Sequence, residues 1–278
     1  MELSRRLAAI AEMVEEGSRL ADVGTDHGYL PIWLVKTEKI PCAVAMDIGE
    51  GPLSRARDHV KAFGLEDRIR LRLSDGFEAL QPGEAEAAVI AGMGGPLMIR
   101  ILEDGREKIR DFRYLVLSPQ SEIADVRRYL LSHDYAITEE NMVLDEGKYY
   151  TVMKAKRGAA GQEPWSYIEE QYGKLLLSSG SGTVIACLEK EQDSLRQVRD
   201  QLLLAGSEKA RERLRQVEEE LQNAERAYQT ALASAEMREN RQKDGEKESR
   251  TPDGKTDGNR KEQEGETQDE NMQDQNMQ

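Results

Sequence analysis

The sequence has little of what marks membrane, disulfide-bonded or metal-binding proteins. It contains two cysteines, Cys42 and Cys187, which lie far apart and form no CxxC motif, so neither a disulfide framework nor a zinc site is predicted. No apolar run approaches the roughly 20 residues that cross a bilayer. Residues 1–17 have an amphipathic helical pattern with acidic residues, unlike a secretory signal. We therefore expect a cytoplasmic protein without a bound metal.

Two common motifs of enzyme sites are also missing. No serine stands in a nucleophile-elbow pattern. No GxGxxG motif follows the first apolar run, because Asp26 occupies the place of the second glycine. A pyrophosphate would meet a carboxylate there, so a dinucleotide is disfavoured, whereas a ligand with a cationic amino-acid portion is favoured. An NAD-dependent oxidoreductase stays open as an alternative.

The carboxyl-terminal residues lack apolar side chains almost completely. From Arg241 onward there is no Leu, Ile, Val, Phe, Tyr or Trp, and residues 239–278 hold 7 Lys and Arg against 12 Asp and Glu. Such a segment cannot bury enough apolar surface to offset chain entropy. We predict a disordered acidic tail over 239–278. The net charge of the whole chain, −14, argues weakly against a general nucleic-acid binder, although local patches matter more than the sum.

What is present is a repeated pattern of strand, turn and helix. The apolar runs are residues 20–23, 42–46, 69–73, 87–91 and 114–117. Short, continuous apolar strands separated by helices predict a parallel sheet covered on both faces. Residues 135–144 and 148–156 instead alternate apolar and polar side chains around a turn, which predicts an antiparallel hairpin. Together they favour an α/β fold of the Rossmann-like class I methyltransferase type over a six-stranded dinucleotide fold.

The periodicity changes after residue 158. Apolar residues recur at seven-residue spacing from Val184 to Ala205 and again from Leu214 to Ala235. Gly206 and Ser207 between the two runs provide a helix stop and an N-cap. We predict three regions: an α/β domain over 1–157, an antiparallel helical hairpin resembling a coiled coil over 165–238, and the tail.

Glycines and carboxylates gather where the predicted strands end, which is where doubly wound sheets bind ligands. Gly24 permits a tight turn after the first strand, and Asp22 beside it offers a partner for an ammonium group. Asp47 closes the second strand and suits two ribose hydroxyls, and Asp75 closes the third and suits an adenine amino group. Any one of these aspartates has an alternative role as a helix cap. Three of them at successive strand ends favour a binding role for the set.

Three segments resemble the bacterial tRNA (adenine(22)-N(1))-methyltransferase family. They are Ala21-Asp-Val-Gly-Thr-Asp-His-Gly-Tyr-Leu-Pro31, Ser74-Asp-Gly76 and Ile90-Ala-Gly-Met-Gly-Gly95. The resemblance covers roughly residues 1–157, and the helical hairpin is similar to that family's carboxyl-terminal domain. One departure is that many members carry Gln-Pro-Asn after the fifth strand, where this chain has Ser118-Pro-Gln120.

The resemblance implies transfer of the methyl group of S-adenosylmethionine to N1 of a tRNA adenine, expected at position 22 in the D-loop region. It also implies which residues contact the cofactor. These are Asp22, Gly24, Asp47, Ile48, Asp75, Gly76, Gly92, Met93 and Gly94. Asp75 and Gly76 would hold the cofactor adenine, and residues 92–95 would form the floor between cofactor and target base.

The chemistry suggests which further residues act. N1 has a lone pair in neutral adenine, so no base is required before attack, and positive charge passes from the sulfonium to the methylated adenine. Stabilisation of that cation is then a main demand, together with alignment, and Asp26 is the first candidate for it. His27 is a candidate for hydrogen bonding to the target base, and Tyr29 for stacking on it. Local packing is the alternative for both. His59 and His133 are expected at the surface.

A tRNA substrate needs positive charge near the active face. The candidates are Arg5, Arg6, Arg55, Arg57, Arg127 and Arg128. Each of them alone has an equally ordinary alternative as a solvated surface charge. We expect a monomer. A methyltransferase with another substrate, and a non-enzymatic interaction module, stay open as alternatives.

Overall fold

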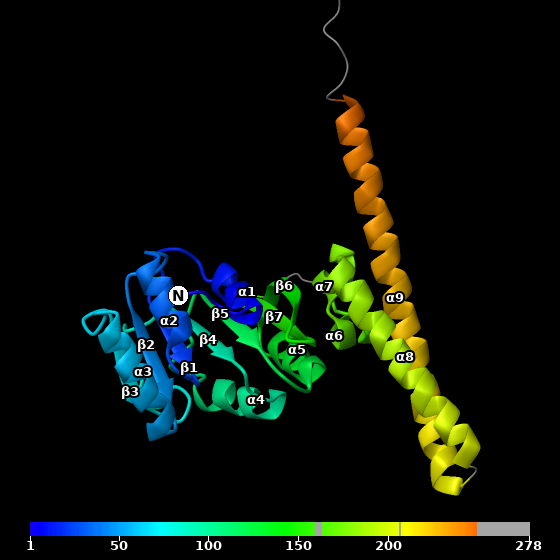
Figure 1. Ribbon diagram of the computed structural model, residues 1–278, viewed down its shortest axis with the longest axis horizontal. Coiled ribbons are helices and arrows are strands. Elements are labelled where there is room, and N and C mark those ends of the chain that lie inside the picture. The colour runs from blue at the N-terminus through cyan, green and yellow to red at the C-terminus, as the bar shows by residue number, and fades with distance from the viewer. Residues whose placement is uncertain (159–162, 206, 249–278) are drawn as a thin grey trace, which may run out of the picture. The chain divides into compact units, whose positions relative to one another are not determined.

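Seven strands form one sheet in the order β3-β2-β1-β4-β5-β7-β6 (Figure 1). The computed structural model describes residues 1–158, 163–205 and 207–248. The strands are β1 (Leu20–Val23), β2 (Ala43–Asp47), β3 (Ile69–Leu73), β4 (Ala87–Ala91), β5 (Tyr114–Ser118), β6 (Tyr135–Asp145) and β7 (Lys148–Arg157). The first five pair in parallel, and β7 runs antiparallel to both β5 and β6. The predicted parallel sheet with a terminal hairpin is confirmed.

Helices cover both faces of the sheet (Figure 1). On one face lie α1 (Arg5–Met13), α2 (Tyr29–Lys36) and α3 (Glu50–Ala62), and on the other α4 (Gly95–Asp104) and α5 (Ile123–Ser132). The inner strands β1, β2, β4 and β5 are largely apolar because alternate side chains serve different cores. Leu20 packs with the first group of helices and Ala21 with the second.

The connection from β3 to β4 contains turns and no helix, unlike the other parallel connections. The Ser74 hydroxyl donates to Gly76 O (2.9 Å) and accepts from Ala79 N (3.0 Å). This local bonding satisfies backbone groups that a helix would otherwise pair, and it holds residues 74–79 as a compact turn at the end of β3.

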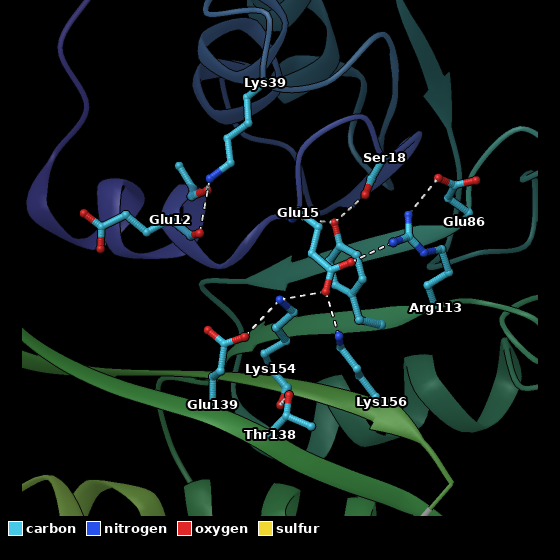
Figure 2. Close-up of polar contacts among 12 residues, drawn as sticks. Glu12, Glu15, Ser18, Lys39, Glu86, Arg113, Thr138, Glu139, Lys154 and Lys156 are labelled. Carbon is cyan, nitrogen blue, oxygen red and sulfur yellow. Dashed lines mark hydrogen bonds and ion pairs between the residues drawn. The ribbon is translucent and has the colours of Figure 1, made fainter. Parts of the chain in front are cut away.

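A charged network fastens the end of α1 to the sheet (Figure 2). The Glu15 carboxylate accepts from Lys156 (2.7 Å), Arg113 (2.9 Å) and Lys154 (3.0 Å). Lys154 is buried and also pairs with Glu139 (3.0 Å). The hydrogen bond from Lys156, with those from Lys154, keeps the pKa of Glu15 below its ordinary value despite partial burial. The network fixes α1 against β5 and β7, and so fixes its first turn beside the ligand-binding edge of the sheet.

Four helices follow the sheet: α6 (Tyr167–Tyr172), α7 (Lys174–Ser179), α8 (Gly182–Ala205) and α9 (Glu208–Glu248). The sequence predicted the two long ones but not the two short ones. Val184 and Leu188 of α8 pack with Ala227 and Ala231 of α9 in a separate apolar cluster. Farther along α8, Leu203 and Leu204 are exposed. Coiled-coil packing along the whole hairpin therefore stays a prediction.

The end of α9 overlaps the first residues of the predicted tail. Helix α9 continues to Glu248, because residues 239–248 are rich in Glu, Lys, Arg and Gln, which favour helix. The rest of the predicted tail, residues 249–278, lies outside the described residues, as does the predicted stop at Gly206. The predicted N-cap is present, since Ser207 Oγ accepts from Ala210 N at 3.2 Å.

A buried ion pair joins the sheet to the helices that follow it. Arg127 on α5 and Glu140 on β6 are 2.8 Å apart, and their side chains are 2% and 0% exposed. Arg127 also donates to Gln171 O (2.9 Å), and Leu175 N donates to Glu140 (3.1 Å). Gly173, with φ +93°, leaves room for the pair, since a Cβ there would lie 2.8 Å from both charged groups. Arg127 therefore has a structural role, which corrects its prediction as a tRNA-binding residue.

Candidate active site

A cleft of about 400 Å³ opens at the carboxyl ends of β1, β4 and β5. It is lined by Arg6, Leu7, Asp22, Gly24, Thr25, Asp26, His27, Tyr29, Leu30, Ala91, Gly92 and Gln120. The cleft lies where strand order reverses, between β1 and β4, which is the expected ligand position in an open α/β sheet. Six of the predicted catalytic and cofactor-binding residues meet here, and they are Asp22, Gly24, Asp26, His27, Tyr29 and Gly92.

Asp22 provides a buried negative charge in this cleft. Its side chain is 6% exposed, and burial raises its pKa to about 6, with a further contribution from the charge of Asp47. The nearby Thr25 hydroxyl counteracts part of this rise in the pKa of Asp22, although the two groups are not in hydrogen-bonding geometry. No Lys or Arg within the described residues pairs with Asp22. A buried carboxylate without a cation fits a ligand that brings an ammonium group.

Gly24 keeps the backbone after β1 open to close approach. Its φ of +80° belongs to the left-handed region, and a Cβ there would overlap the Met93 methyl group. Met93 comes from the loop after β4, so the two loops meet over the end of the sheet. Gly92 in the same loop also has φ +80° and lines the cleft. Met93 therefore fills the space that a side chain at position 24 would take, whereas Gly92 leaves the backbone of its loop uncovered at the cleft.

Three rings stack at the mouth of the cleft. The ring centroids of His27 and Tyr29 lie 5.3 Å apart, and His59 lies 5.1 Å from Tyr29 and 5.7 Å from His27. His59 Nδ1 lies 2.8 Å from His27 O, so the Nδ1–H tautomer donates to that carbonyl. His27 has a left-handed backbone, with φ +61°, which this bond supports. The prediction that His59 is a surface residue is wrong, because it is half-buried and stacks on α2 from α3.

Asp26 lies on the rim, where it is 62% exposed. Its Oδ1 accepts from Arg55 (2.9 Å) and lies 3.5 Å from His27 Nε2. No hydrogen bond or ion pair within the described chain uses Oδ2. One oxygen of this carboxylate thus remains available beside the stacked rings.

Other predicted cofactor residues lie outside the cleft lining. Asp47 accepts from Gly49 N (2.7 Å) at the end of β2, and Ile48 beside it is exposed. Asp75 and Gly76 line a second hollow of about 290 Å³ at the end of β3, where Asp75 pairs with Arg100 (3.1 Å). Gly94 lies close to Ser121 in the loop after β5, since a Cβ built on Gly94 would lie 3.0 Å from the Ser121 hydroxyl oxygen.

Sequence reasoning missed the part that Gln120 and Thr25 play in the cleft lining. Gln120 follows β5, and its position at the end of a parallel strand was the signal that should have placed it at the same edge. Thr25 has no sequence signal of its own within the glycine-containing loop after β1. The two residues add neutral polar groups to a site that sequence reasoning built from carboxylates and aromatics.

The predicted tRNA-binding arginines have different surroundings. Arg6 lines the cleft and stacks on Tyr150, with 5.2 Å to the ring centroid. Arg55 pairs with Asp26, and Arg128 pairs with Asp125 on α5. Arg5 and Arg57 are exposed.

Neither a membrane span nor a metal site occurs in the described part of the chain. None of its helices combines the length and apolarity needed to cross a bilayer, and it contains no group of three or more His, Cys, Asp or Glu arranged to hold a metal ion.

Comparison with known proteins gives one consistent result. Residues 3–153 match a methyltransferase domain family. A Bacillus subtilis tRNA (adenine(22)-N(1))-methyltransferase is 39% identical over 57% of this chain and 66% of its own length, slightly less than two thirds. The crystal structure of the B. subtilis m1A22 tRNA methyltransferase TrmK matches 82% of this chain and 99% of its own, with 30% identity and a TM-score of 0.73. A candidate tRNA (m1A22) methyltransferase of Streptococcus pneumoniae, solved with S-adenosylmethionine, matches 82% and 100%, with 31% identity and a TM-score of 0.73.

Proposed function

The chain belongs to the bacterial tRNA (adenine(22)-N(1))-methyltransferase family of class I S-adenosylmethionine-dependent methyltransferases, and we propose that it methylates N1 of a tRNA adenine, at position 22. The observation that carries the proposal is the buried Asp22 carboxylate, which faces the cleft beside Gly24 and pairs with no Lys or Arg of the described residues. The alternatives of another substrate and of an NAD-dependent oxidoreductase have no support from the relatives' names.

The residues of the cleft fit the methionine portion of the cofactor. Asp22 would accept a hydrogen bond from its ammonium group, and Gly92 would let the methionine portion lie close to the backbone of the loop after β4. Asp47 suits the ribose hydroxyls, with Ile48 beside it. Asp75 and Gly76 suit the cofactor adenine at the end of β3, where Asp75 pairs with Arg100. The Met93 side chain lies over Gly24, and Gly94 allows its loop to pack closely against Ser121.

S-adenosylmethionine supplies the methyl group, whose bond to sulfur breaks as the adenine N1 lone pair forms the new bond, leaving a thioether and a positively charged base. The protein has to align the base and stabilise this charge. Asp26 does the latter through Oδ2, while Arg55 holds Oδ1. Tyr29 provides a stacking surface, and His27 a hydrogen-bonding group, at the mouth of the cleft.

An Asp26→Ala variant tests the role of that carboxylate. We expect kcat for methyl transfer to fall at least about tenfold, because the developing cation loses its counter-charge, while the affinity for S-adenosylmethionine is unchanged. Arg55→Ala is the matched control, since it removes the ion pair but keeps Asp26. Unaltered kcat in Asp26→Ala would remove this residue from the mechanism.

The tRNA contacts belong to the same proposal. Arg6 is the one of the six predicted arginines that lines the cleft, and Arg5 and Arg57 extend positive charge from it over α1 and α3. The domain division, the monomeric state and the cytoplasmic location expected from sequence stay predictions alongside it.

Nucleoside mass spectrometry of cellular tRNA tests the proposed function. Cells that lack the chain are expected to lose N1-methyladenosine from the tRNAs that carry adenine at position 22, and re-expression of the wild-type chain is expected to restore it. Re-expression of an Asp22→Asn variant serves as the control. An unchanged N1-methyladenosine content at position 22 in cells without the chain would contradict the proposal.

A further inference from the structure

Gln120 presents an unpaired carboxamide in the active-site cleft. It follows β5, and its backbone N–H donates to Met93 O (2.8 Å), which ties it to the loop after β4. Its side chain is exposed and makes no hydrogen bond within the described residues. A Cβ built on Gly92 would lie 3.9 Å from Gln120 Nε2. The carboxamide thus lies just beyond the glycine that faces the cofactor and target base.

The polar surroundings of this carboxamide leave it free for a ligand. Arg6 lies close by, with its Nη1 3.7 Å from the same Cβ built on Gly92. Arg6 is stacked on Tyr150, and its backbone N–H donates to Asp145 (3.2 Å), so its position is set by β6 and β7. Gln120 offers a donor and an acceptor side by side in one planar carboxamide, without adding positive charge near the base that becomes cationic.

We propose that Gln120 reads the N6 and N7 edge of the target adenine and thereby determines specificity for adenine. The inference rests on the proposed function. A carboxamide accepts from the adenine N6 amino group and donates to N7 at the same time. N1 lies on the other edge of the base, so this contact leaves its lone pair free for the methyl group. A contact with the N1 edge would block the reaction.

The same geometry disfavours guanine. Guanine presents O6 and N7, both acceptors, on this edge, so the carboxamide oxygen of Gln120 would meet O6 without a proton between them. A buried or partly buried mismatch of this kind costs more than a missing contact. An arginine at this position would instead favour guanine.

The test compares two target bases with two proteins. Ligated tRNA carries either adenine or 7-deazaadenine at the target position, which removes the N7 acceptor but keeps N1 and the amino group. For the wild type we expect kcat/KM to fall at least about fivefold with 7-deazaadenine. Gln120→Ala is expected to lower kcat/KM for adenine by about 5- to 150-fold and to show no further loss with 7-deazaadenine.

S-adenosylmethionine affinity, measured by calorimetry, is the control for intact folding and is expected to be equal in Gln120→Ala and the wild type, because the backbone bond to Met93 is kept. Equal penalties for 7-deazaadenine in both proteins would contradict the inference while leaving the proposed function in place. Failure of the wild type to methylate adenine in tRNA would contradict the proposed function itself, and this inference with it.

Discussion

Asp22→Asn is expected to lower the affinity for S-adenosylmethionine at least about 30-fold, since removing one member of a desolvated charge pair costs about 2–5 kcal/mol. Asn keeps the shape of the side chain but cannot attract the ammonium group. Isothermal titration calorimetry on the purified protein measures the change. Asp58→Asn, at an exposed position of α3, is the matched control and should bind like the wild type.

Asp22→Asn is also expected to be more stable than the wild type when no cofactor is bound. Burial raises the pKa of Asp22 from 3.8 to about 6, so the folded state holds its proton more tightly than the unfolded state. The free energy of unfolding therefore falls as pH rises between these values, by about 3 kcal/mol at pH 7. Asn removes this cost. A variant that loses both stability and affinity would show damage to the fold instead of loss of a binding charge.

The pH dependence of binding follows from the same group. The ammonium of the cofactor binds the ionised carboxylate, so wild-type affinity should decrease as pH falls through about 6. Asp22→Asn should lack this component. Calorimetric titrations at pH 5 and pH 8 compare the two proteins, and identical profiles would show that another group is responsible.

Glu140→Ala is expected to reduce the free energy of unfolding by about 3–5 kcal/mol. The substitution leaves Arg127 buried beside the carbonyl oxygens of Glu170 and Gln171 without its counter-charge, and the desolvation cost of that cation is no longer offset. Urea unfolding followed by circular dichroism measures the loss.

Two further variants separate this effect from a general sensitivity of the region. Arg127→Met combined with Glu140→Leu replaces the pair by apolar groups and should recover most of the stability, because neither charge then remains alone. Arg128→Ala removes an exposed pair with Asp125 and should cost at most about 1 kcal/mol. A loss below about 1 kcal/mol in Glu140→Ala would contradict the structural role of this pair.

The sheet and the ligand-binding edge were predictable because their signals are local. Each of the inner parallel strands β1, β2, β4 and β5 is a short, largely apolar run that ends at a polar or glycine residue, and parallel strands bring those ends to one edge. Asp22 and Gly24 could be placed in the cleft by that rule alone. Asp75 obeyed the same rule but lies in a separate hollow, because the turn after β3 and its Arg100 contact shape that end of the sheet.

What sequence could not show were contacts between distant segments. Arg127 and Arg128 are adjacent arginines that the sequence alone does not distinguish. Arg127 is buried beneath α6 and α7, whereas Arg128 faces solvent. His59 stacks on residues of another helix, and Gln120 reaches the cleft only through the order of the strands. Side-chain burial and cross-element pairing depend on tertiary packing, which residue spacing along one helix does not encode.

Methyl transfer by the purified protein tests most directly whether the chain methylates the adenine at position 22 of tRNA. The reaction contains S-adenosylmethionine labelled in its methyl group and one of two tRNA transcripts, which differ only by adenine or guanine at position 22. We expect label in the adenine transcript alone, recovered as N1-methyladenosine after digestion to nucleosides. Label that persists in the guanine transcript would contradict the target position, and label in neither transcript would contradict the proposed activity.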